Sequence, residues 1–181
     1  MLTKTHYDEL LQSAIAKEII ELNFKSLDGD QPLEYLLYGL PSKERRNDGR
    51  IRSRWLTRYK HTSYGGFWCS GIDVMTGEYS EWGQFKPNRP RKSGEEKKRV
   101  KYEPPSKVAT EIFALRIPYR LALIIAKRNE TELDDSVWED PKTGEAVGFW
   151  LWVRNNPKVR VLITEGAKKA GSLLSAGHCA I

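Results

Sequence analysis

The stretch that decides the fold is Val159-Arg160-Val161-Leu162-Ile163-Thr164-Glu165-Gly166-Ala167-Lys168-Lys169-Ala170, which continues to Gly177-His178-Cys179-Ala180-Ile181. The branched residues at 159–163 predict a strand, which we expect to be buried on both faces. Glu165 and Gly166 predict a tight turn into a helix, and the last residues predict the start of a second strand. Together with helices and a hairpin upstream, this order predicts a mixed α/β (α+β) fold with an incomplete βαβ unit.

The turn after this strand brings chemically useful groups together. Glu165 is expected at the carboxyl end of the strand, where open α/β sheets bind their ligands. The first N–H groups of the following helix and the ammonium groups of Lys168 and Lys169 can bind phosphate, and a carboxylate can hold a divalent cation. A carboxylate that is simply favoured by the helix dipole is the alternative interpretation of Glu165.

Composition and charge narrow the function classes. The 181 residues suit one domain, or one domain and part of another, and the net charge of +6 favours a polyanionic partner over a merely basic surface. The two cysteines and three histidines form no zinc motif, and the absence of a signal peptide favours reduced thiols and a cytoplasmic protein. No apolar run reaches the ~20 residues of a membrane-spanning helix.

The positive charge is concentrated in two segments. Residues 43–60 and 86–101 each hold eight basic and two acidic residues, whereas residues 1–42 hold three basic and seven acidic residues. We expect the second segment to be a mobile loop that follows a nucleic-acid backbone, or else a solvated linker. The predicted nucleic-acid-binding residues are Arg45, Arg46, Arg50, Arg52, Arg54, Arg58, Lys86, Arg89, Arg91, Lys92, Lys97, Lys98 and Arg99.

The first basic segment allows two interpretations. Ile51, Trp55 and Tyr59 recur every four residues, so their rings can stack on unpaired bases while arginines on another face bind phosphate. Alternatively, the aromatic residues belong to the core, and the arginines are solvated or pair with the acidic N-terminal helix.

The remaining elements follow from hydrophobic spacing and turn residues. We expect helices at 3–22, 33–38, 119–128 and 146–155, a hairpin with arms at 65–73 and 79–85, and a strand at 109–117. In the 119–128 helix, Leu121, Leu123, Ile124 and Ile125 are expected to face inward. We divide the chain into a helical and hairpin region, 1–101, and an α/β region, 102–181.

Ile163-Thr164-Glu165-Gly166 resembles the opening motif of Toprim domains, which occur in bacterial-type primases, topoisomerases and related nucleases. Residues 6–181 also resemble the N-terminal region of cyanobacterial plasmid replication proteins, which carry a Toprim-like domain before a helicase part. The matching pieces are Asp28-Gly29-Asp30, Leu33-Glu34-Tyr35-Leu36-Leu37, Gly66-Phe67-Trp68-Cys69-Ser70-Gly71, Trp82-Gly83-Gln84-Phe85-Lys86-Pro87 and Thr164-Glu165-Gly166-Ala167-Lys168-Lys169-Ala170.

The resemblance implies that Glu165 is a general acid or base in phosphoryl chemistry and that Gly166 forms its turn. In the family a later Asp-x-Asp holds Mg²⁺, and this motif has no counterpart before Ile181. We therefore expect a domain truncated at this point, no cofactor for this chain, and Mg²⁺ only in a full-length form.

These expectations describe the N-terminal part of a primase-like or initiator-like replication protein, inactive alone, that binds single-stranded or non-specific duplex DNA. The alternatives are a non-catalytic nucleic-acid-binding module or truncated remnant, and an interaction domain for acidic proteins.

Overall fold

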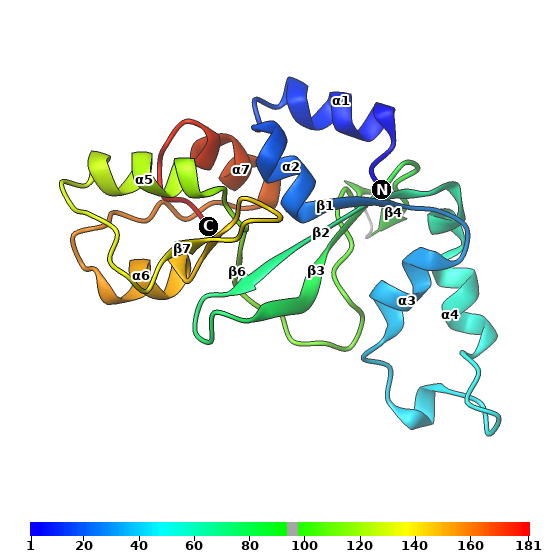
Figure 1. Cartoon of the computed structure of the whole chain (residues 1–181). Coiled ribbons are helices and arrows are strands. Elements are labelled where there is room, and N and C mark those ends of the chain that lie inside the picture. The colour runs from blue at the N-terminus through cyan, green and yellow to red at the C-terminus, as the bar shows by residue number, and fades with distance from the viewer. Residues whose placement is uncertain (94–97) are drawn as a thin grey trace. The chain divides into compact units, whose positions relative to one another are not determined.

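The computed structural model describes residues 1–93 and 98–181, which form two compact units (Figure 1). Unit 1 comprises Met1, Lys25–Cys69 and Trp82–Thr110, and unit 2 comprises Leu2–Phe24, Ser70–Glu81 and Glu111–Ile181. The mixture of helices and antiparallel strands confirms an α+β fold. These units describe packing, and the expected sequence boundary after residue 101 stays a prediction.

A four-stranded sheet runs through the middle of the chain. Its order is β1 (Phe24–Leu27), β2 (Gly66–Asp73) and β3 (Tyr79–Pro87), and β6 (Phe113–Ala114) pairs antiparallel with the end of β2. The hairpin predicted from the aromatic-rich arms is confirmed as β2 and β3. The strand expected over 109–117 is reduced to β6, which bonds β2 only at two positions.

Unit 1 packs short helices on its strands. Figure 1 shows α3 (Gln31–Leu37) beside α4 (Ser53–Arg58), and the 3₁₀ turns η1 (Ser42–Glu44) and η2 (Lys60–Tyr64) flank α4 in the sequence. Apolar burial is the main force holding such a unit together. Its core is made of Leu27, Leu36, Leu37, Leu40, Trp55, Tyr59, Trp68 and Phe85.

The second basic segment contains a small hairpin. β4 (Lys92–Ser93) pairs antiparallel with β5 (Lys98–Arg99), and Phe85 and Glu103 exchange backbone hydrogen bonds of 2.8–2.9 Å beyond it. The segment was expected to be a mobile loop, and the described part of it contains these two short paired strands instead of loop alone. The pairing could not be predicted from the sequence because the paired residues are polar or charged and show no apolar strand pattern. Lys97, one of the predicted binding residues, lies outside the described residues.

The first helices belong to unit 2. The single helix expected over 3–22 is two helices, α1 (Lys4–Gln12) and α2 (Lys17–Asn23). Ala14 between them has a left-handed φ of 57°, which interrupts the helix. The N–H of Ala16 donates to Ser175 Oγ at 2.8 Å, so α7 (Ala167–Ser175) supplies the acceptor that a continuous helix would have provided.

The rest of unit 2 consists of α5 (Tyr119–Arg128), β7 (Trp138–Glu139), β8 (Ala146–Val147), α6 (Phe149–Asn155) and α7 (Ala167–Ser175). The bounds of α5 are confirmed, but Leu123 and Ile124 are 48% and 44% exposed, contrary to expectation. The buried stripe consists of Leu121, Ala122, Ile125 and Ala126, because one helix face covers the core.

The aromatic helix begins later than expected. Residues 146–147 pair with β7, and Gly148, at a φ of 83°, separates them from α6. Within residues 1–93 and 98–181, no helix is both long enough and apolar enough to cross a bilayer.

Candidate functional site

The C-terminal stretch forms the outline of a strand–helix–strand unit. Leu162 and Ala180 form a parallel bridge on either side of α7, supported by Leu162 N–H to Cys179 O and Ile181 N–H to Leu162 O, both 2.9 Å. A third bond runs from Thr164 N–H to Ile181 O at 2.6 Å. The C-terminus lies among α5, α6 and α7 (Figure 1).

The expectation that residues 159–163 form a strand buried on both faces is wrong. Val161 and Leu162 are 39% and 42% exposed, and Ile163 is 84% exposed. Parallel strands are buried on both faces when further strands and helices cover them. In the described part of the chain, the backbone bonds of residues 162–164 to another extended segment run only to residues 179–181.

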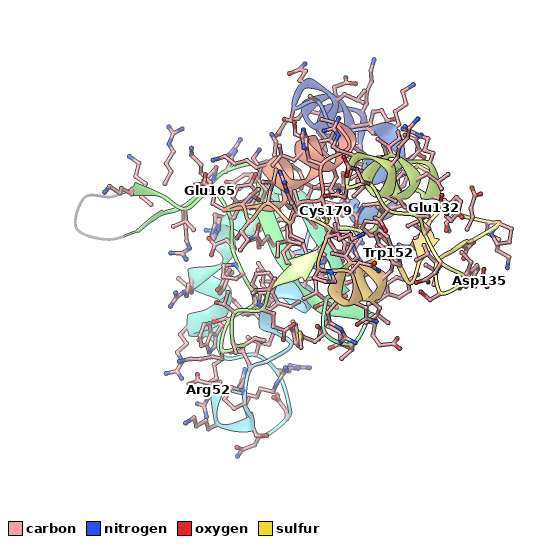
Figure 2. The ribbon with its side chains drawn as sticks, turned by 90° about the vertical axis from the view of Figure 1, so that its left-hand side faces the viewer. Arg52, Glu132, Asp135, Trp152, Glu165 and Cys179 are labelled. Atoms are coloured by element: carbon pink, nitrogen blue, oxygen red, sulfur yellow. The ribbon has the colours of Figure 1, made fainter. Side chains whose placement is uncertain are left out.

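Glu165 lies at the carboxyl end of this segment with 80% of its side chain exposed (Figure 2). Its Oε1 accepts a hydrogen bond from Lys169 Nζ at 2.7 Å, an i,i+4 ion pair on the first turn of α7. Lys168 points elsewhere, since its Nζ donates to Glu9 Oε1 of α1 at 2.8 Å. The structure thus brings one of the two predicted phosphate-binding ammonium groups to Glu165 and takes the other to α1.

Gly166 does not use the conformational freedom that the sequence suggested. Its φ of 175° is extended backbone that any residue adopts, and it is the residue before α7. The turn is closed instead by Thr164, whose Oγ1 donates to Gly166 O at 3.2 Å. The carbonyl of Gly166 then accepts from the N–H groups of Lys169 and Ala170, so the residue starts the helix.

The donor set at Glu165 does not fit a bound Mg²⁺ in this chain. The carboxylate is already paired with Lys169. Among the residues that the structure describes, no three His, Cys, Asp or Glu side chains are grouped as metal ligands. A hard cation needs several oxygen ligands at once, and the single carboxylate of Glu165 supplies too few of them.

The first basic segment divides into structural and exposed arginines. Arg45 donates to the carbonyl oxygens of Leu37, Leu40 and Gly49 at 3.4–3.5 Å and is half-buried. Arg54 forms an ion pair with Glu44, whose pKa is lowered by this hydrogen bond and by a second one from Trp55. The arginines with exposed side chains are Arg46, Arg50, Arg52, Arg54 and Arg58.

Trp55 and Tyr59 lie in the core with 6% and 3% exposure, as the alternative interpretation expected, so their rings are not available to bases. The guanidinium of Arg58 lies over both rings, 5.7 and 5.9 Å from their centroids. This contact orients Arg58 on the exposed side of α4. Arg54 pairs inside unit 1, at Glu44, and not with the acidic N-terminal helix.

The second basic segment shows the same division. Arg91 binds Glu103 with two parallel hydrogen bonds, Nε to Oε1 at 2.7 Å and Nη2 to Oε2 at 2.9 Å. Arg89 lies 3.8 Å from the centroid of the Tyr64 ring and Lys86 5.3 Å from that of Phe67. Lys92, Lys98 and Arg99 on the small hairpin are exposed.

Both basic segments belong to unit 1. This unit holds 18 Lys and Arg and 8 Asp and Glu, a net charge of +10, whereas unit 2 holds 12 and 16, a net charge of −4. The overall charge of +6 therefore conceals a strongly basic unit and an acidic one. By net charge alone, a polyanion is attracted to the first unit and not to the second.

Sequence reasoning missed two buried carboxylates that organise these units. Glu103 is 1% exposed, and besides Arg91 its Oε1 contacts His61 Nε2 at 3.1 Å. The hydrogen bonds from Arg91 to this carboxylate raise the pKa of the guanidinium. Nothing in Tyr102-Glu103-Pro104 distinguishes Glu103 from a surface glutamate, so no local signal could have found it.

Glu145 is the corresponding carboxylate of unit 2. It is 1% exposed and accepts hydrogen bonds from Arg116 Nε at 2.8 Å and from the Tyr79 hydroxyl at 3.2 Å. Burial opposes the charge of Arg116, but the bonds to Glu145 outweigh it and raise the pKa of the guanidinium. Asn23 completes the network by accepting the N–H of Arg116 at 2.7 Å.

The comparisons with known proteins assign no function, and the family match falls on the region that includes the C-terminal strand–helix–strand unit. Residues 149–181 match the family described as a domain of unknown function, DUF3854. An uncharacterized protein of the cyanobacterium Picosynechococcus sp. is 51% identical over 181 residues, which are 99% of this chain but 17% of that relative. The chain thus spans about a sixth of the length of the relative it matches. No solved structure matches the chain significantly.

Proposed function

We propose that this chain is a nucleic-acid-binding part of a cyanobacterial plasmid replication protein of the primase or initiator kind, acting in the cytoplasm. The observation that carries the proposal is the separation of charge, with +10 on unit 1 and −4 on unit 2. DNA is the polyanion that such a unit suits best, because each neutralised phosphate releases condensed counterions.

The exposed cations of unit 1 suit the DNA backbone and not base edges. Arg46, Arg52 and Arg58 project from a turn and a short helix, and Lys92, Lys98 and Arg99 from a small hairpin. Flexible or exposed cations of this kind hold phosphates without reading a sequence. With Trp55 and Tyr59 buried, aromatic stacking on bases has no support from that pair, so binding is expected to be sequence-tolerant.

The Toprim-like part of the proposal rests on the C-terminal unit. Its parallel bridge across α7 and an exposed carboxylate at the end of the first extended segment support it. In this proposal Glu165 serves phosphoryl chemistry only in a longer protein, where further carboxylates and Mg²⁺ complete the site. The match of residues 149–181 to a domain of unknown function is compatible with this assignment.

A non-catalytic nucleic-acid-binding module is the second candidate. The pairing of Lys168 with Glu9 and of Lys169 with Glu165 favours it, because both ammonium groups already neutralise carboxylates of unit 2. In that case unit 1 has the same function, and Glu165 is only the partner of a helix salt bridge, of the kind that is worth little to stability.

Fluorescence anisotropy with labelled DNA tests the proposal. We expect the chain to bind single-stranded and duplex oligonucleotides of unrelated sequence with similar affinity, and to lose at least ~100-fold in affinity between 50 and 200 mM salt. A polyglutamate peptide of equal charge serves as the competitor. If the peptide displaces DNA at equal charge concentration, the partner is an acidic protein and the nucleic-acid proposal is refuted.

A further inference from the structure

Unit 2 contains a basic cleft that plays no part in the proposed function. The cleft has a volume of about 710 Å³ and is lined by Arg128, Asn129, Glu130, Lys158, Arg160, Leu162, His178 and Cys179. Three permanently or normally cationic side chains and a histidine thus surround one space in a unit whose net charge is −4. Glu130 is the acidic residue among the lining side chains.

The cleft lies away from Glu165. Lys158 and Arg160 precede the extended segment that ends at Glu165, and the five steps of extended backbone from Arg160 to Glu165 span about 16 Å. Cys179, which lines the cleft, and Glu165 also lie at separate places in Figure 2. The cleft is therefore at the amino end of the parallel pair, opposite the carboxylate.

Backbone contacts hold the cationic residues in place. Asn129 follows α5, and its Oδ1 accepts the N–H of Arg160 at 3.0 Å, while its Nδ2 donates to Ile125 O at 2.8 Å. The turn before Arg160 is closed by Val159 N–H to Asn156 O at 3.0 Å, which positions Lys158. The end of α5 and the start of the extended segment are thus joined into one wall.

The other wall depends on a glycine. Gly177 has a φ of 78°, and a Cβ there would lie 2.6 Å from Ile124 Cγ2, so the close approach of this turn to α5 requires glycine. The turn brings His178 to Arg128, with Arg128 Nη1 2.6 Å from Nε2 and 3.0 Å from Nδ1 of the ring. Lys158 and Arg160 form no ion pair within residues 1–93 and 98–181.

We propose that this cleft binds a phosphate-bearing anion, with Arg128, Arg160 and Lys158 as its donors and His178 beside Arg128 as a reporter of binding. Guanidinium groups bind phosphate oxygens with two parallel hydrogen bonds, and an ammonium adds a single one. The volume exceeds that of a single phosphate group and lies in the range of small-molecule sites, so a chain of two or three phosphates fits better than one. The same chemistry occurs in a nucleoside triphosphate and in a stretch of nucleic-acid backbone.

Cys179 takes no chemical part in this site. Burial raises the pKa of its thiol to about 12, so the sulfur is neutral at physiological pH and is neither a nucleophile nor a competing anion. The thiol is therefore not a part of the proposed phosphate site.

The test uses inorganic tripolyphosphate and a ¹H–¹³C NMR spectrum of the histidine rings. The chain has three histidines. His6 in α1 is buried and serves as the internal control, whereas His61 belongs to unit 1 and reports separately on binding there. We expect the His178 signals, assigned with His178→Gln, to shift on titration. In the cleft variant, Lys158→Gln combined with Arg160→Gln, the apparent affinity for tripolyphosphate read from that shift should fall at least ~10-fold. The control variant, Lys4→Gln combined with Lys17→Gln, removes two exposed charges from the same unit. Its apparent affinity for tripolyphosphate should stay within about 2-fold of the wild type.

A second titration distinguishes the source of the phosphates. The probe is an eight-nucleotide oligothymidylate without a terminal phosphate. If it shifts the His178 signals, and if its apparent affinity is lower for the cleft variant, the ligand is the nucleic-acid backbone. A response to tripolyphosphate alone identifies a free polyphosphate or nucleotide. His178 signals that stay fixed with both probes, or that shift equally in the cleft variant and the wild type, overturn the proposal. Both variants carry exposed substitutions, and unchanged amide spectra verify that they fold.

Discussion

The ion pair between Glu103 and Arg91 offers the sharpest test of how unit 1 holds its second basic segment. Glu103 is 1% exposed and Arg91 23% exposed, and two hydrogen bonds of 2.7 and 2.9 Å join them. The perturbation is Glu103→Gln, which keeps the shape of the side chain and removes its charge. Arg91 then donates to a neutral amide that has one acceptor oxygen where the carboxylate had two.

The expected cost follows from this geometry. Breaking a fully buried ion pair costs about 3–5 kcal/mol, mainly because the remaining charge is left without a partner. Arg91 reaches solvent in part, and the glutamine still accepts one hydrogen bond, so we expect about 2–3 kcal/mol. The comparison is Arg50→Gln, whose partner Asp48 lies 3.8 Å away on an exposed turn of the same unit. That change should cost less than about 0.5 kcal/mol.

The assay is urea unfolding followed by tryptophan fluorescence, with Glu103→Gln, Arg91→Gln and the double variant forming a cycle. We expect a coupling energy of about 1.5–3 kcal/mol between the two positions. A coupling below about 0.5 kcal/mol, or a cost of Glu103→Gln no greater than that of Arg50→Gln, would show that the pair does not anchor the segment.

Further predictions concern single residues of unit 2 and the two thiols. Gly148→Ala places a Cβ 2.2 Å from Ser136 O at a φ of 83°, and should cost at least ~2 kcal/mol in urea unfolding, whereas Gly144→Ala, with nothing nearer than 3.8 Å, should cost about 1 kcal/mol. Cys69 and Cys179, whose pKa values are raised by burial, should react with an aromatic disulfide at pH 8 only after unfolding; rapid reaction of the native chain would contradict their burial. Burial and then the charge of Glu145 raise the pKa of Tyr79, so absorbance at 295 nm should show a phenol that ionises above its ordinary range and is missing in Tyr79→Phe. Its contribution to stability is complete below pH ~10 and is lost as the pH rises through the folded pKa. Glu165→Ala should leave DNA binding unchanged, and the chain should show no Mg²⁺-dependent nucleotidyl transfer; transfer abolished by this change would contradict the assignment of catalysis to a longer protein.

Elements with strong local signals could be predicted from the sequence. The bounds of α5 followed from Pro118 before an apolar run, and the hairpin of β2 and β3 from aromatic arms around a glycine turn. The break at Ala14 could not be predicted, because the hydrogen bond that accompanies it runs from Ala16 to Ser175, which lies far away in the sequence. Local patterns do not contain such partners.

The sequence could predict which residue types make up the candidate sites, but not which side chains pair with each other. The sequence located the basic residues, yet it could not show that Arg91 is committed to Glu103 or that Lys168 turns to Glu9. The basic cleft of unit 2 was missed for the same reason, since its residues come from positions 128, 158, 160 and 178. Spatial grouping of distant charges is a property of the fold.

The most direct test of the proposed function compares two triple variants in salt-dependent DNA binding. Arg46, Arg52 and Arg58 of unit 1 are changed to glutamate in one variant, and Lys4, Lys17 and Lys142 of unit 2 in the other. Arg54 is left unchanged because its reversal would set a second carboxylate against Glu44. All six chosen side chains are exposed, so both variants change the net charge equally. We predict that the unit 1 variant loses at least ~10-fold more affinity and that its log–log salt slope for duplex DNA falls by about 2–3. Equal losses in both variants would contradict the claim that unit 1 is the DNA-binding surface.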